Sequence, residues 1–93
     1  MKNLLHQKTP VEISKELAQR LKYRRKKMKI SQSELAKLSG VSLGSIKRFE
    51  TKYEIALISL IKIAIVLDTE GDFDNLFSKK VYNSIEEIIN GEI

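Results

Sequence analysis

The segment from Ser31 to Glu50 constrains the fold more than any other stretch, because it has the pattern of two short helices around a tight turn. Apolar side chains recur in it at helical spacing. They are Leu35, Ala36, Leu38, Val41, Ile46 and Phe49. Gly40 stands where the first helix must end and the chain must turn without a clash of a Cβ atom. Ser42 can then cap a second helix, whose inner face carries Ile46 and Phe49.

Two short helices joined by a glycine-containing turn form a helix-turn-helix unit. The outer face of the second helix would carry Leu43, Gly44, Lys47 and Arg48. Cations beside small or apolar groups suit the major groove of DNA, because they let the backbone approach the base edges closely. The segment therefore predicts a DNA-reading helix.

Length and composition exclude several classes of protein. The chain has 93 residues, which is enough for one domain. It contains no cysteine and one histidine, His6. We therefore expect no metal centre, and no cofactor because a glycine-rich phosphate loop is absent. The apolar pair Leu4-Leu5 is too short for a signal peptide, and the longest apolar run, 63–67, is too short to span a membrane. A cytoplasmic location is the default expectation.

Charge is distributed unevenly along the chain. Residues 1–67 contain 15 Lys and Arg against 5 Asp and Glu, whereas residues 68–93 contain 2 against 7. The first part favours a polyanion as partner, and the second part does not. We infer two surfaces with different partners.

A helix is predicted on the N-terminal side of the central unit. Thr9, Pro10 and Glu12 are the cap, first-turn proline and capping-box acid of a helix that runs to about Lys27, after an arm of residues 1–9. The predicted inner stripe is Ile13, Leu17, Leu21 and Met28. Basic residues cover much of the rest, namely Lys15, Arg20, Lys22, Arg24, Lys26 and Lys27. They form either a solvated face or a phosphate-facing surface, and the adjacent unit favours the latter.

Ser31 and Glu34 form a second capping box, which places Gln32 in the first turn of its helix. There the Gln32 amide and the unpaired backbone N–H groups can hold a phosphate. The third helix is predicted at about 42–51, followed by a turn over 51–56 without glycine or proline.

The fourth helix, about 57–67, has more apolar residues than one core face can bury. Leu57, Leu60, Ala64 and Leu67 are spaced as a core face. Three further isoleucines, Ile58, Ile61 and Ile65, lie away from it. Their cover must be the tail of the chain, a second protomer or a partner protein. We favour a mixture of the tail and a second protomer.

The tail predicts two short helices. Asp72 can cap the first, which would carry Phe73, Leu76 and Phe77 on one side. The capping-box sequence from Ser84 opens the second, which would end near Asn90 and carry Ile85, Ile88 and Ile89. The predicted organisation is thus an arm at 1–9, a DNA-binding domain at 10–70 and a contact tail at 71–93, in an all-α fold of five helices with a short helical tail.

From Leu17 to Leu67 the chain resembles the Cro and phage-repressor helix-turn-helix family, also called the XRE family. The resemblance rests on residues spread over a little more than half of the chain. They are Leu17, Leu21, Arg25, Ser31-Gln32, Glu34-Leu35-Ala36, Gly40-Val41-Ser42, Ile46, Glu50, Leu57, Leu60, Ala64 and Leu67. It implies a compact lambda-repressor-like domain that binds a palindromic operator as a homodimer through its third helix.

The resemblance also implies roles for single residues. Gln32, Ser42 and Thr51 would contact phosphates, and Arg25 with Glu50 would form a buried ion pair. The DNA-facing positions would be Leu43, Gly44, Ser45, Lys47, Arg48 and Lys52. Of these, Arg48 suits the O6 and N7 atoms of a guanine. The chain departs from the family pattern at Leu43 and Gly44, where many members have glutamine or arginine. It also departs after the third helix, where Lys52-Tyr53 replace the usual glycine, and at Ala56, which replaces a polar cap.

Three functions remain open on these grounds. The first is a sequence-specific repressor of transcription. The second is an antitoxin, because the tail is similar to that of HipB-like antitoxins, which bind DNA and a HipA-type kinase toxin. The third is a protein-interaction module without DNA binding, which the absence of polar side chains at Leu43 and Gly44 would fit. An enzyme is not expected, since no paired-carboxylate pocket or nucleophile with a base is present.

Overall fold

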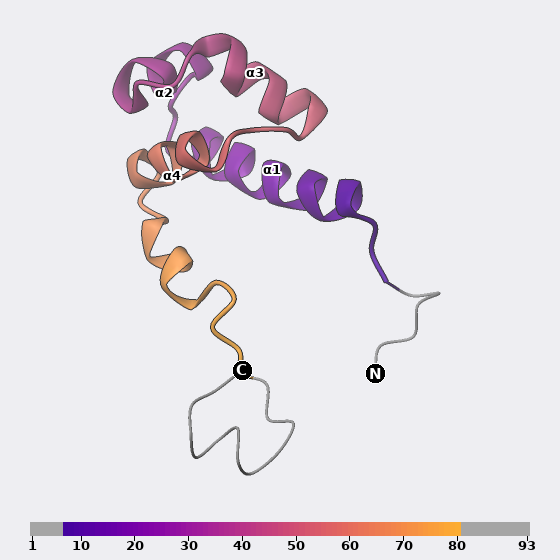
Figure 1. Ribbon diagram of the computed structural model, residues 1–93. Coiled ribbons are helices and arrows are strands. Elements are labelled where there is room, and N and C mark those ends of the chain that lie inside the picture. Colours follow the sequence, from indigo (N-terminus) through magenta and orange to yellow (C-terminus); the bar gives the residue numbers. More distant parts are fainter. Residues whose placement is uncertain (1–6, 81–93) are drawn as a thin grey trace.

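Four α-helices and a short 3₁₀ helix make up residues 7–80, the part of the chain that the computed structural model describes (Figure 1). They are α1 (Pro10–Lys27), α2 (Gln32–Ser39), α3 (Leu43–Lys52), α4 (Leu57–Val66) and the 3₁₀ helix η2 (Glu70–Asn75). Residues 7–80 contain no strand. The fold is therefore all-α, as the sequence predicts.

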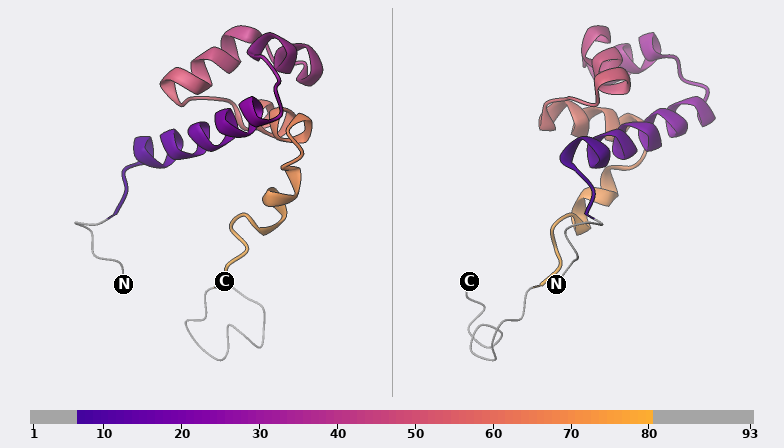
Figure 2. Two further views of the ribbon diagram at one scale, coloured as in Figure 1. Left: turned by 180° about the vertical axis from the view of Figure 1, so that it is seen from behind. Right: turned by 90° about the vertical axis from the view of Figure 1, so that its right-hand side faces the viewer.

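The four α-helices of residues 7–80 are arranged in two groups, α2 with α3 and α1 with α4 (Figures 1 and 2). Helices α2 and α3 lie together at one end of the molecule, above α1 and α4, and η2 leads away from the end of α4 (Figures 1 and 2). Helix α2 packs on α3 and α4, and α3 also packs on α1. The predicted helix-turn-helix unit, α2 with α3, thus forms one outer edge of the domain.

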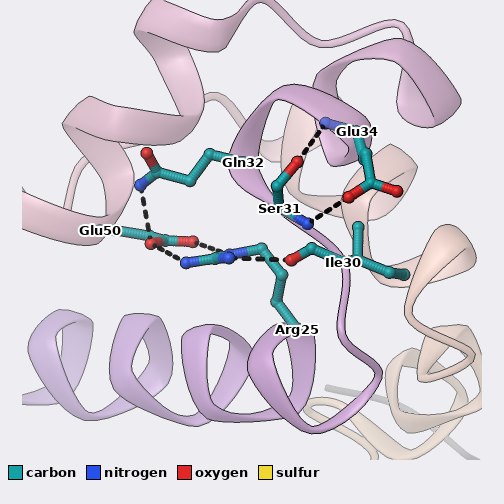
Figure 3. Close-up of polar contacts among 6 residues, drawn as sticks. All are labelled: Arg25, Ile30, Ser31, Gln32, Glu34 and Glu50. Carbon is teal, nitrogen blue, oxygen red and sulfur yellow. Dashed lines mark hydrogen bonds and ion pairs between the residues drawn. The ribbon is translucent and has the colours of Figure 1, made fainter.

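Local capping explains where these helices begin. The hydroxyl of Thr9 accepts a hydrogen bond from the Glu12 N–H at 3.1 Å, and the Glu12 carboxylate accepts one from the Thr9 N–H. Ser31 and Glu34 repeat this reciprocal pair at the start of α2 (Figure 3). Helix α2 ends at Gly40, whose φ of 76° lies in the left-handed region that favours glycine. The predicted capping boxes at Thr9 and Ser31 and the glycine turn are confirmed.

The core consists of two adjoining clusters. Leu35, Val41, Ile46, Ile63 and Leu67 make up the first, and Ala18, Phe49 and Leu60 the second. Leu21 and Ile55 pack against both clusters. Because Ile46 belongs to one cluster and Phe49 to the other, α3 is anchored at two points along its length.

The predicted inner stripe of α1 is wrong at three of its four positions; the fourth, Leu21, is half-buried and packs against both core clusters. Ile13, Leu17 and Met28 are exposed, and the buried residues of this helix are Ala18 and Arg25. Ala18 and Arg25 are seven residues apart, two helical turns, so the buried face is turned about the helix axis from the predicted stripe. Apolar spacing could not indicate this, because the buried face includes an arginine.

Two further core residues are also misassigned. Leu38 of α2 and Leu57 of α4 are exposed, although the sequence pattern places both in the core. Ile63, which the predicted face omits, is buried with Leu60 and Ala64. The core lies along Leu60, Ile63 and Ala64. Leu57 lies on the same side of α4 as Leu60 and Ala64, three and seven residues before them, but it stands in the first turn and is exposed. As expected from their surplus, Ile58 and Ile65 are exposed and Ile61 is half-buried.

The predicted cap of the fifth helix is also wrong. Helix η2 begins at Glu70, and Thr69, not Asp72, precedes it. The Thr69 hydroxyl donates to the Ala64 carbonyl, and the Asp72 N–H donates to the Thr69 carbonyl at 3.0 Å. With this link to α4, the helix starts three residues earlier than a cap at Asp72 would place it. Phe73 packs against the second core cluster, whereas Leu76 and Phe77 are exposed. The predicted helix at 84–90 lies outside the described residues.

Within residues 7–80, no helix is long and apolar enough to cross a membrane.

Lys29, in the connection between α1 and α2, provides a test of backbone strain. Its φ is 57°, and its side chain is exposed. The left-handed conformation costs a residue with a Cβ atom about 1–2 kcal/mol, and glycine loses about 0.5–1 kcal/mol more entropy on folding. We expect Lys29→Gly to raise the free energy of unfolding by about 0.5–1 kcal/mol in urea denaturation. The control Gln19→Gly, in the exposed middle of α1, should lower it by about 1 kcal/mol, and a lower stability of Lys29→Gly would contradict the argument.

Candidate nucleic-acid interface

Helix α3 has a buried side and an exposed side. Ile46 and Phe49 are 0% and 3% exposed, whereas Lys47, Arg48, Thr51 and Lys52 are all exposed. The sequence predicted these anchors and this outward face. Between Leu43 and Lys52 the one acidic residue is Glu50, which is turned inward. The outward side of α3 is consequently basic.

The N-terminal end of α3 is open. The Ser42 hydroxyl accepts a hydrogen bond from the Ser45 N–H at 3.1 Å and donates to the Ser45 hydroxyl at 2.8 Å. Leu43 is half-buried, and Gly44 is exposed with no atom within 4 Å of the position that a Cβ would take. No neighbour in the described fold therefore requires glycine there. Its effect is to leave space at the surface.

Arg25 and Glu50 form the ion pair that the family resemblance implies (Figure 3). Arg25 Nε lies 2.8 Å from Glu50 Oε2 and Arg25 Nη2 lies 2.9 Å from Oε1, and the two side chains are only 8% and 4% exposed. Arg25 Nη1 also donates to the Ile30 carbonyl at 2.9 Å. The pair joins α1 to α3, and the third bond holds the connection to α2.

Gln32 belongs to the same network. Its Nε2 atom donates to Oε1 of Glu50 at 2.9 Å, the same oxygen that accepts from Arg25 Nη2 (Figure 3). The amide, predicted as a phosphate contact, is therefore oriented by an intramolecular bond. The start of α2 and the end of α3 share one carboxylate, so their relative position is fixed by it.

The network determines the ionisation of Glu50. Burial by itself would raise the pKa of its carboxyl, but hydrogen bonds from Arg25 and Gln32 and the charge of Arg25 outweigh burial. The pKa of Glu50 consequently lies below its ordinary value. Glu50 therefore stays charged at neutral pH.

Arg48, predicted to read a base, is paired on the surface with Glu54. Arg48 Nη2 lies 2.6 Å from Oε1 of Glu54, and both side chains are largely exposed. Sequence analysis missed Glu54, because residues six apart do not share a helical face. One sign that this turn is unusual is present in the sequence, which is the absence of glycine in residues 51–56. Nearby, the Thr51 hydroxyl donates to the Lys47 carbonyl at 2.7 Å.

The basic residues of α1 do not act as one surface. Arg24 Nε donates to the Leu67 carbonyl and Arg24 Nη2 to the Asp68 carbonyl, at the end of α4. Lys27 Nζ lies 5.4 Å from the centre of the Tyr23 ring. Arg24 therefore satisfies orphan carbonyl groups of α4. Sequence reasoning missed this role, since the two residues it joins to Arg24 are more than forty positions away.

Among residues 7–80, no three His, Cys, Asp or Glu side chains are grouped closely enough to hold a metal ion.

Two short helices joined at a left-handed glycine, with a basic outward second helix, define a helix-turn-helix DNA-binding domain. A family model described as helix-turn-helix matches residues 21–73, more than half of the chain. The chain belongs to this family, the XRE and Cro-repressor type, and is a DNA-binding regulator of transcription. Neither the curated proteins nor the solved structures gave a match to it.

Removing one member of the buried pair tests its role. Arg25→Met leaves the Glu50 carboxylate buried without its cation, so we expect a loss of about 3–5 kcal/mol in the free energy of unfolding. The double variant Arg25→Met/Glu50→Leu should recover most of this loss, because no buried charge remains. As a control, Lys8→Met breaks the exposed Lys8–Glu16 pair and should change stability by less than about 1 kcal/mol. Equal losses in Arg25→Met and the double variant, measured by urea denaturation, would contradict this account.

The lowered pKa of Glu50 predicts acid sensitivity. Unfolding returns the carboxyl to its ordinary pKa of about 4.5. Its contribution to stability is therefore complete above that pH and is lost as the pH falls through the lower, folded-state pKa. The wild-type chain should lose more unfolding free energy between pH 7 and pH 3 than Arg25→Met/Glu50→Leu does. The same loss in both proteins would show that Glu50 is not responsible.

Proposed function

We propose that this regulator is a repressor that binds a palindromic operator as a homodimer and reads its sequence with α3. The observation that carries the proposal is the two-sided character of α3. Ile46 and Phe49 fasten one side to the core, and the opposite side presents Lys47, Arg48 and Lys52. An anchored helix with a basic outward side has the form needed to enter a major groove.

Roles for the surrounding residues extend the proposal. Phosphate contacts are assigned to Gln32, Ser42 and Thr51, and contacts within the groove to Leu43, Gly44, Ser45, Lys47, Arg48 and Lys52. The open surface at Gly44 supports close approach of the backbone to DNA. The hydrogen bond that Gln32 donates to Glu50 supports a fixed position of the Gln32 amide at the phosphate backbone.

The homodimer is supported by the apolar side of α4. Ile58 and Ile65 are exposed and Ile61 is half-buried, and their spacing of three and four residues gives a continuous apolar stripe. A stripe of this kind fits a second copy of the same helix across a two-fold axis. Two copies of α3 would then read two half-sites of one palindrome.

The remaining assignments stay proposals of the same kind. They comprise the division into an arm (1–9), a DNA-binding domain (10–70) and a contact tail (71–93). Phe73 and Phe77 belong to the proposed dimer or partner surface, and Ile85, Ile88 and Ile89 lie outside the described residues. A toxin-binding function would rest on the tail or on α4, whereas the repressor rests on the anchored basic side of α3, and the repressor is the function that the described contacts favour.

Arg48→Ala tests base reading by α3. Wild-type protein is first used to select a duplex from random-sequence DNA. The variant is then expected to bind the selected duplex about 1–3 kcal/mol more weakly, with the loss concentrated at one base pair. Fluorescence anisotropy with duplexes changed at one base pair at a time measures this, and its titrations should give two chains per duplex.

Arg20→Ala is the matched control, because Arg20 lies on the side of α1 opposite Ala18 and Arg25, which face the core. It should leave the preference at every base pair unchanged. A loss in Arg48→Ala that is uniform over all duplexes would contradict base reading. Failure of the wild-type chain to select any duplex would favour the interaction module without DNA binding.

A further inference from the structure

Glu54 holds one edge of the Arg48 guanidinium. Arg48 Nε and Nη2 lie 3.2 and 2.6 Å from the same Glu54 oxygen, Oε1. A guanidinium has five N–H donors in one plane. The edge formed by Nη1 and the second N–H of Nη2 is therefore separate from the edge that Glu54 engages. Arg48 can be paired with Glu54 and still offer two parallel donors.

The turn after α3 creates this pair. In a continuous helix, side chains six residues apart would point in different directions. Tyr53 interrupts the helix with a φ of 64°, and its N–H donates to the Phe49 carbonyl at 3.0 Å. The Tyr53 ring packs against the cluster of Ala18, Phe49 and Leu60. Because the turn is packed from inside, Glu54 is held beside α3.

The negative charge of Glu54 lies where it weakens the electrostatic attraction of this face to DNA. Between Leu43 and Ser59 the acidic residues are Glu50 and Glu54, and Glu50 is buried against Arg25. Glu54 is 64% exposed, so it places a negative charge on an otherwise basic side. A carboxylate there repels phosphates of any sequence. An exposed ion pair contributes little to folding, so stability does not account for its position either.

The pair also borders an open hollow. Arg48 and Glu54 line it together with Ser45 of α3 and Ala56 and Ser59 at the start of α4, and its volume is about 430 Å³. The hollow leaves room for part of a bound duplex next to the pair.

We propose that Glu54 is a specificity-determining residue that positions Arg48 for a guanine. This inference rests on the proposed function. Held along its Nε and Nη2 edge, Arg48 presents the other edge end-on, which matches the O6 and N7 acceptors of guanine. Glu54 also restrains the guanidinium from turning to a phosphate when the base pair is wrong. A duplex with the wrong base pair then gains no phosphate contact from Arg48 instead, and the Glu54 carboxylate still repels it.

Glu54→Gln tests the inference, because it keeps the size of the side chain and removes the charge. Dissociation constants are measured for the duplex that the wild-type chain selects and for duplexes changed at the base pair assigned to Arg48. We expect Glu54→Gln to bind all of them more tightly. The ratio between the right and the wrong base pair should fall about tenfold, the scale of one bidentate contact.

Two controls separate positioning from net charge. Glu70→Gln removes the same charge from η2, which leads away from α3 (Figure 1), and should leave the ratio unchanged. In the Arg48→Ala background, Glu54→Gln should also leave the ratio unchanged, because there is no guanidinium to position. Thermal unfolding of Glu54→Gln should occur close to the wild-type midpoint, since the pair is exposed.

The inference is overturned if Glu54→Gln keeps or sharpens the wild-type ratio, or if Glu70→Gln relaxes the ratio equally. A large drop in the thermal midpoint of Glu54→Gln would assign Glu54 to folding and overturn it too. These results leave the proposed function intact. If Arg48→Ala instead leaves the preference unchanged at every base pair of the selected duplex, Arg48 does not read a base. Base reading by Arg48 and this inference then both fail. If the wild-type chain selects no duplex, the proposed function itself fails.

Discussion

The buried pair of Arg25 and Glu50 is the interaction on which the arrangement of this domain depends. Two charged groups leave water there, and such a transfer is costly unless every charge is matched by close partners. Here the match is nearly complete: two bonds join the pair, Ile30 accepts a third from Arg25, and Gln32 donates a fourth to Glu50. These bonds come from α1, the α1–α2 connection, α2 and α3. A shift of any one of these segments would leave a charge unpaired, so the pair selects one arrangement of the helices.

The apolar core holds the helices together, and the ion pair selects how they are arranged. Ile46 and Phe49 enter two different clusters, which holds α3 at two places. Because the inward side of α3 is occupied in this way and Glu50 is paired, the cations of α3 remain on the outside. The basic surface is therefore a consequence of the core, because the packing of α3 decides which of its side chains remain outside.

The turn at Tyr53 gives this domain its particular surface. A tyrosine stands where the family pattern has glycine, and its left-handed backbone is combined with a ring packed on the second cluster. The strain of that backbone is offset by burial of the ring. A turn held in this manner keeps Glu54 near Arg48, so an acidic residue becomes part of a basic face. The apolar stripe of Ile58, Ile61 and Ile65 on α4 also remains largely at the surface, and we propose a second copy of the chain as its cover.

The sequence by itself determined the features that depend on neighbours along the chain. The caps at Thr9, Ser31 and Ser42, the glycine turn and the anchors Ile46 and Phe49 are set within one or two turns of helix, and all were predictable. The family resemblance added Arg25 with Glu50. Only the tertiary structure decided which side of α1 is buried, that Arg24 bonds the end of α4, and that Glu54 pairs with Arg48. These depend on how helices cross and where a turn redirects the chain, and periodicity within one helix carries no information about either.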